Sequence, residues 1–274
     1  MSDDRLANCL ILHDWANQLD QAKWFDVARQ FFHETGLEPD VAEAGARPRR
    51  TRIIKPKALE KRLAAGAAFT GISLYATLPP HRDFGTQWTV FAGNNVTGTR
   101  KKVLAFIYDS KGTDLEVGLF ADLVYRLSSF VTLTYGYGFQ RPFAKGPAMY
   151  AYDLAYGLDQ RRRPEDKAEV ERMTLWFRER LDLVVQNKPA AYRHLLGLQR
   201  DVFPFNVLTT PHLAQVVGGV PLKQWIETDT ARGVLHRVAP GVWSWVVPAG
   251  ELPAVRARLE AAGLLICRPQ RESR

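Results

Sequence analysis

The sequence predicts an α+β fold, an antiparallel sheet with helices packed on it, followed by a mixed helical and hairpin C-terminal part. Three patterns predict this fold. Apolar residues alternate with other residues in three short runs between residues 68 and 108, and turn residues separate these runs. The run 114–130 then repeats leucine at every fourth position, as an amphipathic helix does, and a fourth alternating run begins at Val131.

The first 66 residues are expected to form a short strand, a helix and a basic segment. Apolar residues recur at helical spacing over residues 14–34, which predicts a helix, and the apolar run 9–12 before it favours a strand. Glycine and proline break the pattern over residues 36–48 and predict a loop. A short helix is expected over residues 56–65, because Pro56 stands in the first turn, where a missing N–H costs little.

Residues 67–160 are expected to hold the sheet and the helix packed on it. The alternating runs predict three strands, over residues 69–76, 88–92 and 103–108. Glycine and asparagine at residues 93–95 and the Thr-Gly-Thr run at 97–99 predict a turn between the second and third strands. After the helix, Gly136 and Gly138 allow the fourth strand to bend or to adopt a positive φ.

Three aromatic residues of the fourth strand, Tyr135, Tyr137 and Phe139, share one face of it, because alternate residues of a strand point to the same side. Two uses fit this arrangement. The rings fill a core beneath the helix 114–130, or they stack on the bases of a nucleic acid. We expect core packing, and base stacking is the alternative.

The C-terminal part is expected to contain short helices and one hairpin. Pro164 and the acids after it predict the start of a helix over residues 165–185. The other predicted elements are short helices over residues 190–198, 210–217 and 221–227, a hairpin over 234–247 and a last helix over 252–262 that ends at Gly263. The whole chain of 274 residues suits a single domain. Its possible subdivision is 1–66, 67–160 and 161–274.

The charge of the chain is concentrated in one short segment. The net charge is +8, yet residues 1–46 contain nine acids and three bases. Residues 47–62 contain eight bases and one acid, and Arg49, Arg50 and Arg52 lie within them. Such a block is a candidate contact for phosphate groups or for an acidic protein surface. The alternative is a solvated connector that lies against the acidic N-terminal helix and partly neutralises it.

Sequence motifs for catalysis and metal binding are missing. The chain has no Gly-x-Ser-x-Gly, no phosphate-binding loop of the Walker type and no His-Glu-x-x-His. Its two cysteines, Cys9 and Cys267, lie near opposite ends, and buried reduced thiols are expected rather than a disulfide. We therefore expect a protein that is not an enzyme and needs no cofactor or metal. No segment has a bilayer-spanning run of apolar residues or the features of a signal peptide, so no membrane partner and a cytoplasmic location are expected.

Several segments in order carry a resemblance to a known family. They are the helix 114–130, the Gly-rich aromatic run Tyr135 to Gln140, the Tyr-Gly-Leu of residues 156–158 and the run Val207 to Gly219. Together they resemble the type VI immunity family, bacterial proteins that protect a cell from toxins, often nucleases, delivered by type VI secretion. The resemblance covers roughly residues 100–250.

The resemblance implies a protein that binds a cognate toxin and covers its active site. A tight complex needs aromatic and arginine anchors on a preorganised surface. The candidate partner-binding residues are Arg49, Arg50, Arg52, Arg141, Tyr150 and Tyr152. The basic charge favours an acidic toxin surface, and contact by shape and aromatic burial with the acids of residues 1–46 at the rim is the alternative. The alternative function is a nucleic-acid-binding accessory protein that uses residues 47–62.

Overall fold

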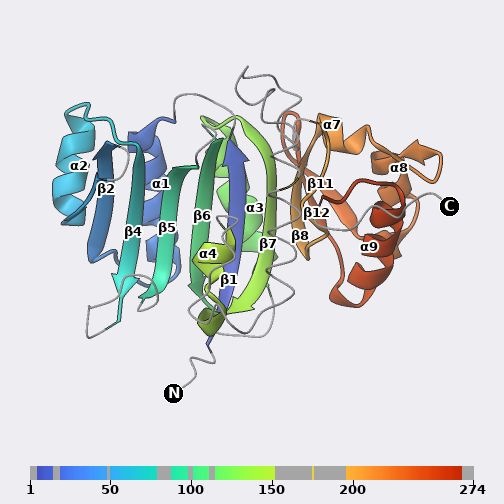
Figure 1. The fold of residues 1–274 in the computed structure, drawn as a ribbon, viewed down its shortest axis with the longest axis horizontal. Coiled ribbons are helices and arrows are strands. Elements are labelled where there is room, and N and C mark those ends of the chain that lie inside the picture. Colours follow the sequence, from blue (N-terminus) through green and yellow to red (C-terminus); the bar gives the residue numbers. More distant parts are fainter. Residues whose placement is uncertain are drawn as a thin grey trace.

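The fold is α+β, as predicted, and is built on one large antiparallel sheet (Figure 1). The computed structural model describes residues 5–14, 19–47, 50–78, 88–97, 101–110, 115–151, 175 and 196–266. The strands, in their order across the sheet, are β11 (Val234–Ala239), β12 (Val242–Val246), β8 (Phe205–Thr209), β7 (Leu133–Pro142), β1 (Leu6–Asp14), β6 (Lys101–Asp109), β5 (Trp88–Thr97), β4 (Gly71–Thr77), β2 (Val41–Arg47) and β3 (Arg50–Ile54). Within the described ranges none of the helices is long and apolar enough to span a membrane.

The helices cover both faces of this sheet. They are α1 (Gln21–Glu34), α2 (Pro56–Ala64), α3 (Val117–Ser128), α4 (Pro147–Ala151), α7 (Thr210–Leu213), α8 (Leu222–Glu227) and α9 (Leu252–Ala261). Figure 1 shows α1 and α3 behind the sheet and α4 in front of it. A small ribbon of β9 (Val216–Val217) and β10 (Val220–Pro221) lies outside the large sheet.

The N-terminal strand β1 occupies the middle of the sheet. The expected short strand at residues 9–12 is part of this nine-residue strand, which pairs with β6 on one side and β7 on the other. Cys9, for example, lies opposite Ile107 and Phe139. The first segment of the chain thus joins strands that are formed from residues far along the sequence.

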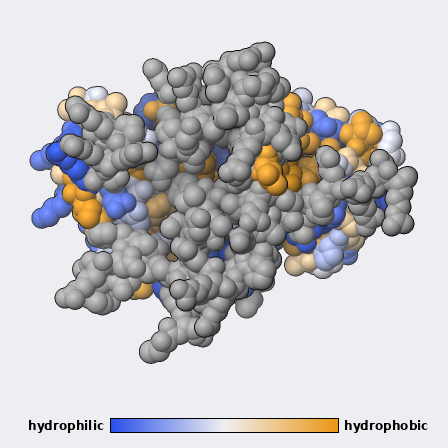
Figure 2. Space-filling model, viewed as in Figure 1, coloured by the Kyte–Doolittle hydropathy of each residue, from blue (hydrophilic) through white to orange (hydrophobic). Residues whose placement is uncertain are grey.

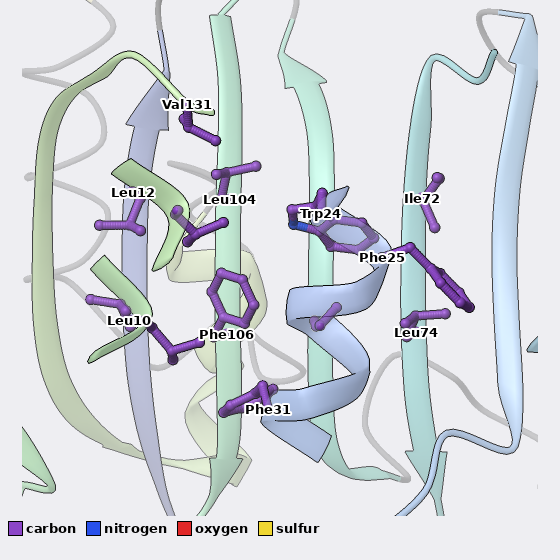
Figure 3. Packing of buried hydrophobic residues seen from close by; sticks show 14 of the residues in the cluster. Leu10, Leu12, Trp24, Phe25, Phe31, Ile72, Leu74, Leu104, Phe106 and Val131 are labelled. Carbon is purple, nitrogen blue, oxygen red and sulfur yellow. The ribbon is translucent and has the colours of Figure 1, made fainter. Parts of the chain in front are cut away.

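Alternate residues of β1 enter two separate cores. Leu10 and Leu12 belong to the core under α1, α2 and α3, whereas Cys9 and Ile11 belong to the core on the opposite face. Figure 3 shows the first core, in which Trp24, Phe25 and Phe31 of α1 point toward Ile72 and Leu74 of β4 and Leu104 and Phe106 of β6. This period of two is the one that a strand buried on both faces requires.

The loop expected over residues 36–48 is wrong, because Val41–Arg47 forms β2 between β4 and β3. Ala42 and Ala44 are buried with the first core, and Glu43 between them faces the other side. Small side chains made this alternation weak in the sequence. The glycines and prolines at residues 36, 39, 45 and 48 were the stronger signal and favoured a loop.

The turn expected at residues 93–95 is wrong, because β5 continues to Thr97 and pairs there with β6. The turn expected at 97–99 lies outside the described residues except for Thr97. Asn94 is buried inside the strand. Its Oδ1 accepts a hydrogen bond of 3.1 Å from the backbone N–H of Ile72 in β4. A residue typical of turns therefore acts here as a cross-strand acceptor.

Gly136 and Gly138 lie inside the continuous strand β7 and do not adopt a positive φ, one of the two conformations that the sequence allowed. Their role is close packing. A Cβ on Gly136 would lie 2.5 Å from Cδ2 of Leu12, and one on Gly138 would lie 2.6 Å from the ring of Phe120 on α3. These glycines let α3 and the neighbouring strand approach the backbone of β7.

Tyr135, Tyr137 and Phe139 are buried core residues, which confirms core packing. The expected location beneath the helix 114–130 is wrong, since the three rings belong to the core on the opposite face from α3. The rings pack there against Phe203 and His212. Buried in this way, they are not available to stack on bases.

The C-terminal part follows the prediction in some elements, whereas the strand β8 was not predicted. The hairpin β11–β12 and the last helix α9 are confirmed, and Gly263 after α9 has a φ of +72°. The helix expected over 210–217 ends at Leu213, and its last residues form β9. The helix expected over 165–185 lies outside the described residues except at Leu175, which is helical. Of the helix expected over 190–198, only 196–198 are described, as a turn and coil.

Candidate functional site

Five exposed basic side chains follow one another along the chain from β3, the last strand of the described sheet, through α2. We call this surface the basic edge: Arg52, Lys55, Lys57, Lys61 and Arg62. Within the part of the chain that the structure describes, β3 pairs with β2 alone. Figure 2 shows hydrophilic residues at the end of the molecule where Figure 1 places α2.

The local sequence explains why these charges face outward. Lys55 precedes Pro56 and is extended, so β3 stops there and Pro56 opens α2. Leu59 and Leu63, four residues apart, are buried against the first core. Lys57 and Lys61 share another helix face with the same spacing and stay exposed. Two like charges at this spacing destabilise a helix by a few tenths of a kcal/mol.

No acid of the N-terminal segment forms an ion pair with the basic edge in the part of the chain that the structure describes. Among the described residues, the ion pair between α1 and α2 joins Arg29 to Glu60 at 2.6 Å, so α2 contributes its acid and not a base. Glu34 of α1 pairs instead with Arg126 of α3. None of the five bases of the basic edge has an ion-pair partner among these residues. The exposure of these bases agrees with the interpretation of this segment as a solvated connector. No ion pair among the described residues supports the expected neutralisation of the acidic helix by it.

The other face of β3 carries an exposed apolar side chain, Ile53. Ile53 is 60% exposed and lies opposite Glu43 of β2, whose carboxylate accepts a hydrogen bond of 2.9 Å from the Tyr75 hydroxyl. Arg52 lies opposite Ala44, which belongs to the core under α1 and α2. Arg52 and the bases of α2 thus lie on one side of the sheet, and Ile53 lies on the other.

Two other predicted contact residues, Arg141 and Tyr150, contact each other. The guanidinium carbon of Arg141 lies 4.4 Å from the centre of the Tyr150 ring, and that of the buried Arg200 lies 4.0 Å from it. Arg200 also donates hydrogen bonds from Nη1 to the Tyr137 hydroxyl at 2.6 Å and to the Tyr150 carbonyl at 3.0 Å. This cluster holds β7, α4 and the segment before β8 together, which is a structural role.

The predicted site residues therefore do not form one surface. β7, which carries Arg141, is six strand positions from β3, which carries Arg52. At roughly 4.8 Å per strand this is a separation of about 29 Å. Arg49 and Tyr152 lie outside the described residues, and Arg50 is described only as part of the backbone of β3.

Of the basic edge, sequence reasoning singled out Arg52 but neither Arg62 nor the lysines. The signal was present, because Lys57 and Lys61 have helical i, i+4 spacing opposite the buried Leu59 and Leu63. Ile53 had no such signal. Its exposure depends on the place of β3 at the end of the sheet.

A hollow of about 520 Å³ lies between α1, α3 and the turn of the β11–β12 hairpin. Lys23, Tyr125 and Arg126 contribute to its wall. Arg126 pairs with Glu34 at 2.8 Å and Asp122 at 2.5 Å, so its charge is already compensated. The hollow offers little attraction for an anionic ligand.

Buried titratable groups serve the fold. His212 is buried, and desolvation lowers its pKa from 6.5 to about 4, so the ring is neutral at pH 7. Its Nδ1 accepts a hydrogen bond of 3.2 Å from the backbone N–H of Thr209 and completes a capping box at α7. Burial raises the pKa of the free thiol Cys9 well above its usual value. Over the described ranges, no group of three or more His, Cys, Asp or Glu side chains is arranged to hold a metal.

Comparison with known proteins gives a similarity of fold. No protein-family model and no curated protein matches the sequence. Among solved structures, the chain is similar to the Pseudomonas aeruginosa T6SS protein PA0821, with a TM-score of 0.54 and 13% sequence identity. The match covers 95% of this chain and 73% of that chain. At this identity the similarity shows that the two chains share a fold along nearly the whole length of this one.

Proposed function

We propose that this protein is an immunity protein that binds a cognate toxin of the type VI secretion system and neutralises it by covering its active site. As part of this proposal, the protein acts in the cytoplasm by binding alone. It uses no cofactor and catalyses no reaction of its own.

Two independent similarities support the link to type VI secretion. The run Tyr135 to Gln140 and the segments around it resemble the type VI immunity family in sequence. The fold resembles that of a T6SS protein over 95% of the chain. Neither similarity depends on the other, because one rests on short motifs and the other on the arrangement of the whole sheet.

The observation that carries the binding function is the basic edge. The basic edge consists of five exposed bases that have no ion-pair partner among the described residues. They lie on β3, at Lys55 and on α2, which Leu59 and Leu63 anchor to the core, and so offer a preorganised cationic surface. A surface of this kind attracts an acidic partner over a Debye length of about 10 Å and speeds association. An acidic surface around the active site of the toxin is the matching chemistry.

The test uses the toxin encoded beside this gene, purified as a catalytically inactive variant. We expect nanomolar affinity for the wild-type chain and a loss of at least about tenfold for Lys61→Glu, since buried or rim charges contribute on this scale. Arg258→Glu is the matched control, because Arg258 is an exposed base on α9 that has no ion pair with any residue the structure describes. We expect the control to bind like the wild type.

Protection of cells provides the second readout. Co-expression of this chain with the active toxin should restore growth, and Lys61→Glu should protect less well than Arg258→Glu. A gene neighbourhood that encodes no toxic protein, or a neighbouring toxin that this chain neither binds nor inhibits, contradicts the proposal.

Nucleic-acid binding by the basic edge is the second candidate, because unpaired bases also neutralise phosphates. It predicts a DNA or RNA affinity that falls steeply with salt and is abolished by reversing the charge of Arg52. The burial of Tyr135, Tyr137 and Phe139 leaves this candidate without its expected stacking surface. A gel-shift assay at low salt that shows no complex excludes it.

A further inference from the structure

The strand β3 has the geometry of an acceptor for an additional strand. It is five residues long, pairs with β2 on one side, and ends the large sheet within the described part of the chain. A strand at a sheet edge presents a row of backbone N–H and C=O groups that a second, extended chain can pair with. Many edge strands are shielded by short length and charge, so the side chains decide which chain can be added.

The two sides of β3 select different side chains. On the side of α2, Arg52 and the neighbouring exposed lysines favour carboxylates. On the other side, Ile53 favours an apolar residue. Since alternate residues of a strand point to opposite faces, a complementary strand alternates acidic and apolar residues.

A second copy of this chain does not fit the same edge. Pairing of β3 with β3 would bring two basic edges together, each with Lys55, Lys57, Lys61 and Arg62 exposed and unpaired among the described residues. The like charges of the two basic edges would repel each other, and like charges directly opposite in a sheet are destabilising. The charge therefore selects an acidic partner protein.

We infer that β3 binds an extended segment of a partner protein, with alternating acidic and apolar residues, which adds to the sheet as an eleventh strand beside the ten. The inference rests on the proposed function for the identity of the partner as the toxin. It adds the mode of binding, which is backbone pairing with β3 combined with ion pairs to the basic edge.

The probe is a synthetic ten-residue peptide of alternating glutamate and valine, labelled with fluorescein and titrated with the full-length protein by fluorescence anisotropy. In such a strand the N–H groups of all glutamates point to one edge and those of all valines to the other. Two further peptides carry N-methyl groups on the glutamates only or on the valines only. Both keep the charge of the parent peptide.

Strand addition uses one edge of the peptide, so one N-methylated peptide should lose at least about tenfold in affinity and the other should bind like the parent. Attraction by charge alone predicts equal affinities for the two methylated peptides, and that result overturns the inference. Absence of binding by the parent peptide at low salt overturns it as well.

Protein variants locate the peptide. Arg52→Glu should weaken binding at least about tenfold, whereas Arg258→Glu should leave it unchanged. Both residues are exposed, and circular dichroism with urea unfolding checks that both variants fold. Equal effects of the two variants would place the peptide elsewhere and contradict the inference.

The outcomes for the toxin separate this inference from the proposed function. If the toxin is neutralised but the amides of β3 gain no protection from hydrogen exchange in the complex, strand addition is wrong and immunity stands. If the peptide binds by one edge but no toxin is neutralised, the strand acceptor stands and immunity is wrong.

Discussion

Tyr135 and His212 stack with nearly parallel rings, 5.4 Å between their centroids and 18° between their planes. Tyr135 comes from the middle of the sheet and His212 from the short helix α7, so the pair fastens the C-terminal part to β7. His13 of β1 stacks with Tyr135 as well, at 5.8 Å and 17°. The neutral form of a buried imidazole thus contributes to the junction between the centre of the sheet and the C-terminal part.

The burial of His212 predicts that the protein loses stability in mild acid. The pKa of His212 is about 4 in the folded chain and about 6.5 when the ring is solvated. The contribution of the neutral ring is therefore complete above pH 6.5 and is lost as the pH falls from 6.5 to 4. We expect a loss of roughly 3 kcal/mol in the free energy of unfolding across this window from His212 alone.

Urea unfolding between pH 4 and pH 8 measures this effect. His212→Gln keeps a hydrogen-bond acceptor at the cap but does not titrate, so its unfolding free energy should change less over the window than that of the wild type. His236→Gln, at an exposed position of β11, is the control and should behave like the wild type. Identical pH profiles for His212→Gln and the wild type would show that the ring does not carry this dependence.

Replacement of glycine by alanine is expected to have opposite effects on stability in β7 and in α3. Gly138→Ala should lower the free energy of unfolding by about 1–3 kcal/mol, because its Cβ would lie 2.6 Å from the Phe120 ring. Gly118→Ala, in α3 with no atom within 4 Å of its Cβ, should raise it by about 0.5–1 kcal/mol. Chemical denaturation of both variants tests the pair. An equal response would contradict close packing as the reason for glycine in β7.

We expect the ion pair between Arg256 of α9 and Asp201 to stabilise the attachment of α9 to the segment before β8. Arg256 Nε donates to the Asp201 carboxylate at 2.8 Å, and Nη2 donates to the Val202 carbonyl at 3.1 Å. Arg256→Met removes both bonds and should cost about 1–3 kcal/mol. Arg258→Met, on an exposed face of the same helix, should change the stability by less than about 0.5 kcal/mol. Thermal unfolding of the two variants under the same conditions measures this difference in stability.

We expect the thiol of Cys9 to react only after the chain has unfolded. It is fully buried in β1, and burial raises the pKa of its thiol, so little thiolate exists at pH 8. In a Cys267→Ser background, a disulfide reagent should modify Cys9 at least about a hundredfold more slowly in the native chain than in urea. Rapid modification of the native chain would show that the centre of the sheet opens readily.

The basic edge predicts a trade-off between stability and binding. Lys57→Glu introduces an acid in the first turn of α2, four residues before Lys61, and should raise the free energy of unfolding by about 0.5 kcal/mol. The same change should weaken binding of the toxin and of the acidic peptide. A solvated connector predicts the gain in stability without the loss of binding. Measurement of both quantities on one preparation separates the two interpretations.

Local periodicity was enough to predict the helices α1 and α2, the hairpin β11–β12 and the last helix α9. The predicted start of α1 at residue 14 is wrong, because Asp14 ends β1 and the helix begins at Gln21. Each of these elements has its signal within its own residues, such as Pro56 at the start of α2 and Gly263 after α9. The clustering of bases in residues 47–62 was also visible in the sequence, and their exposure follows from the burial of Leu59 and Leu63.

The tertiary structure decided what no local pattern contains. Strand partners are chosen by hydrogen bonding and burial between distant segments, so the central place of β1 and the terminal place of β3 could not be derived from their own residues. For the same reason the sequence placed Tyr135, Tyr137 and Phe139 on one face but under the wrong helix. It grouped Arg52 with Arg141, which the sheet holds six strands apart, because a side chain acquires its surface only when the order of the strands is set.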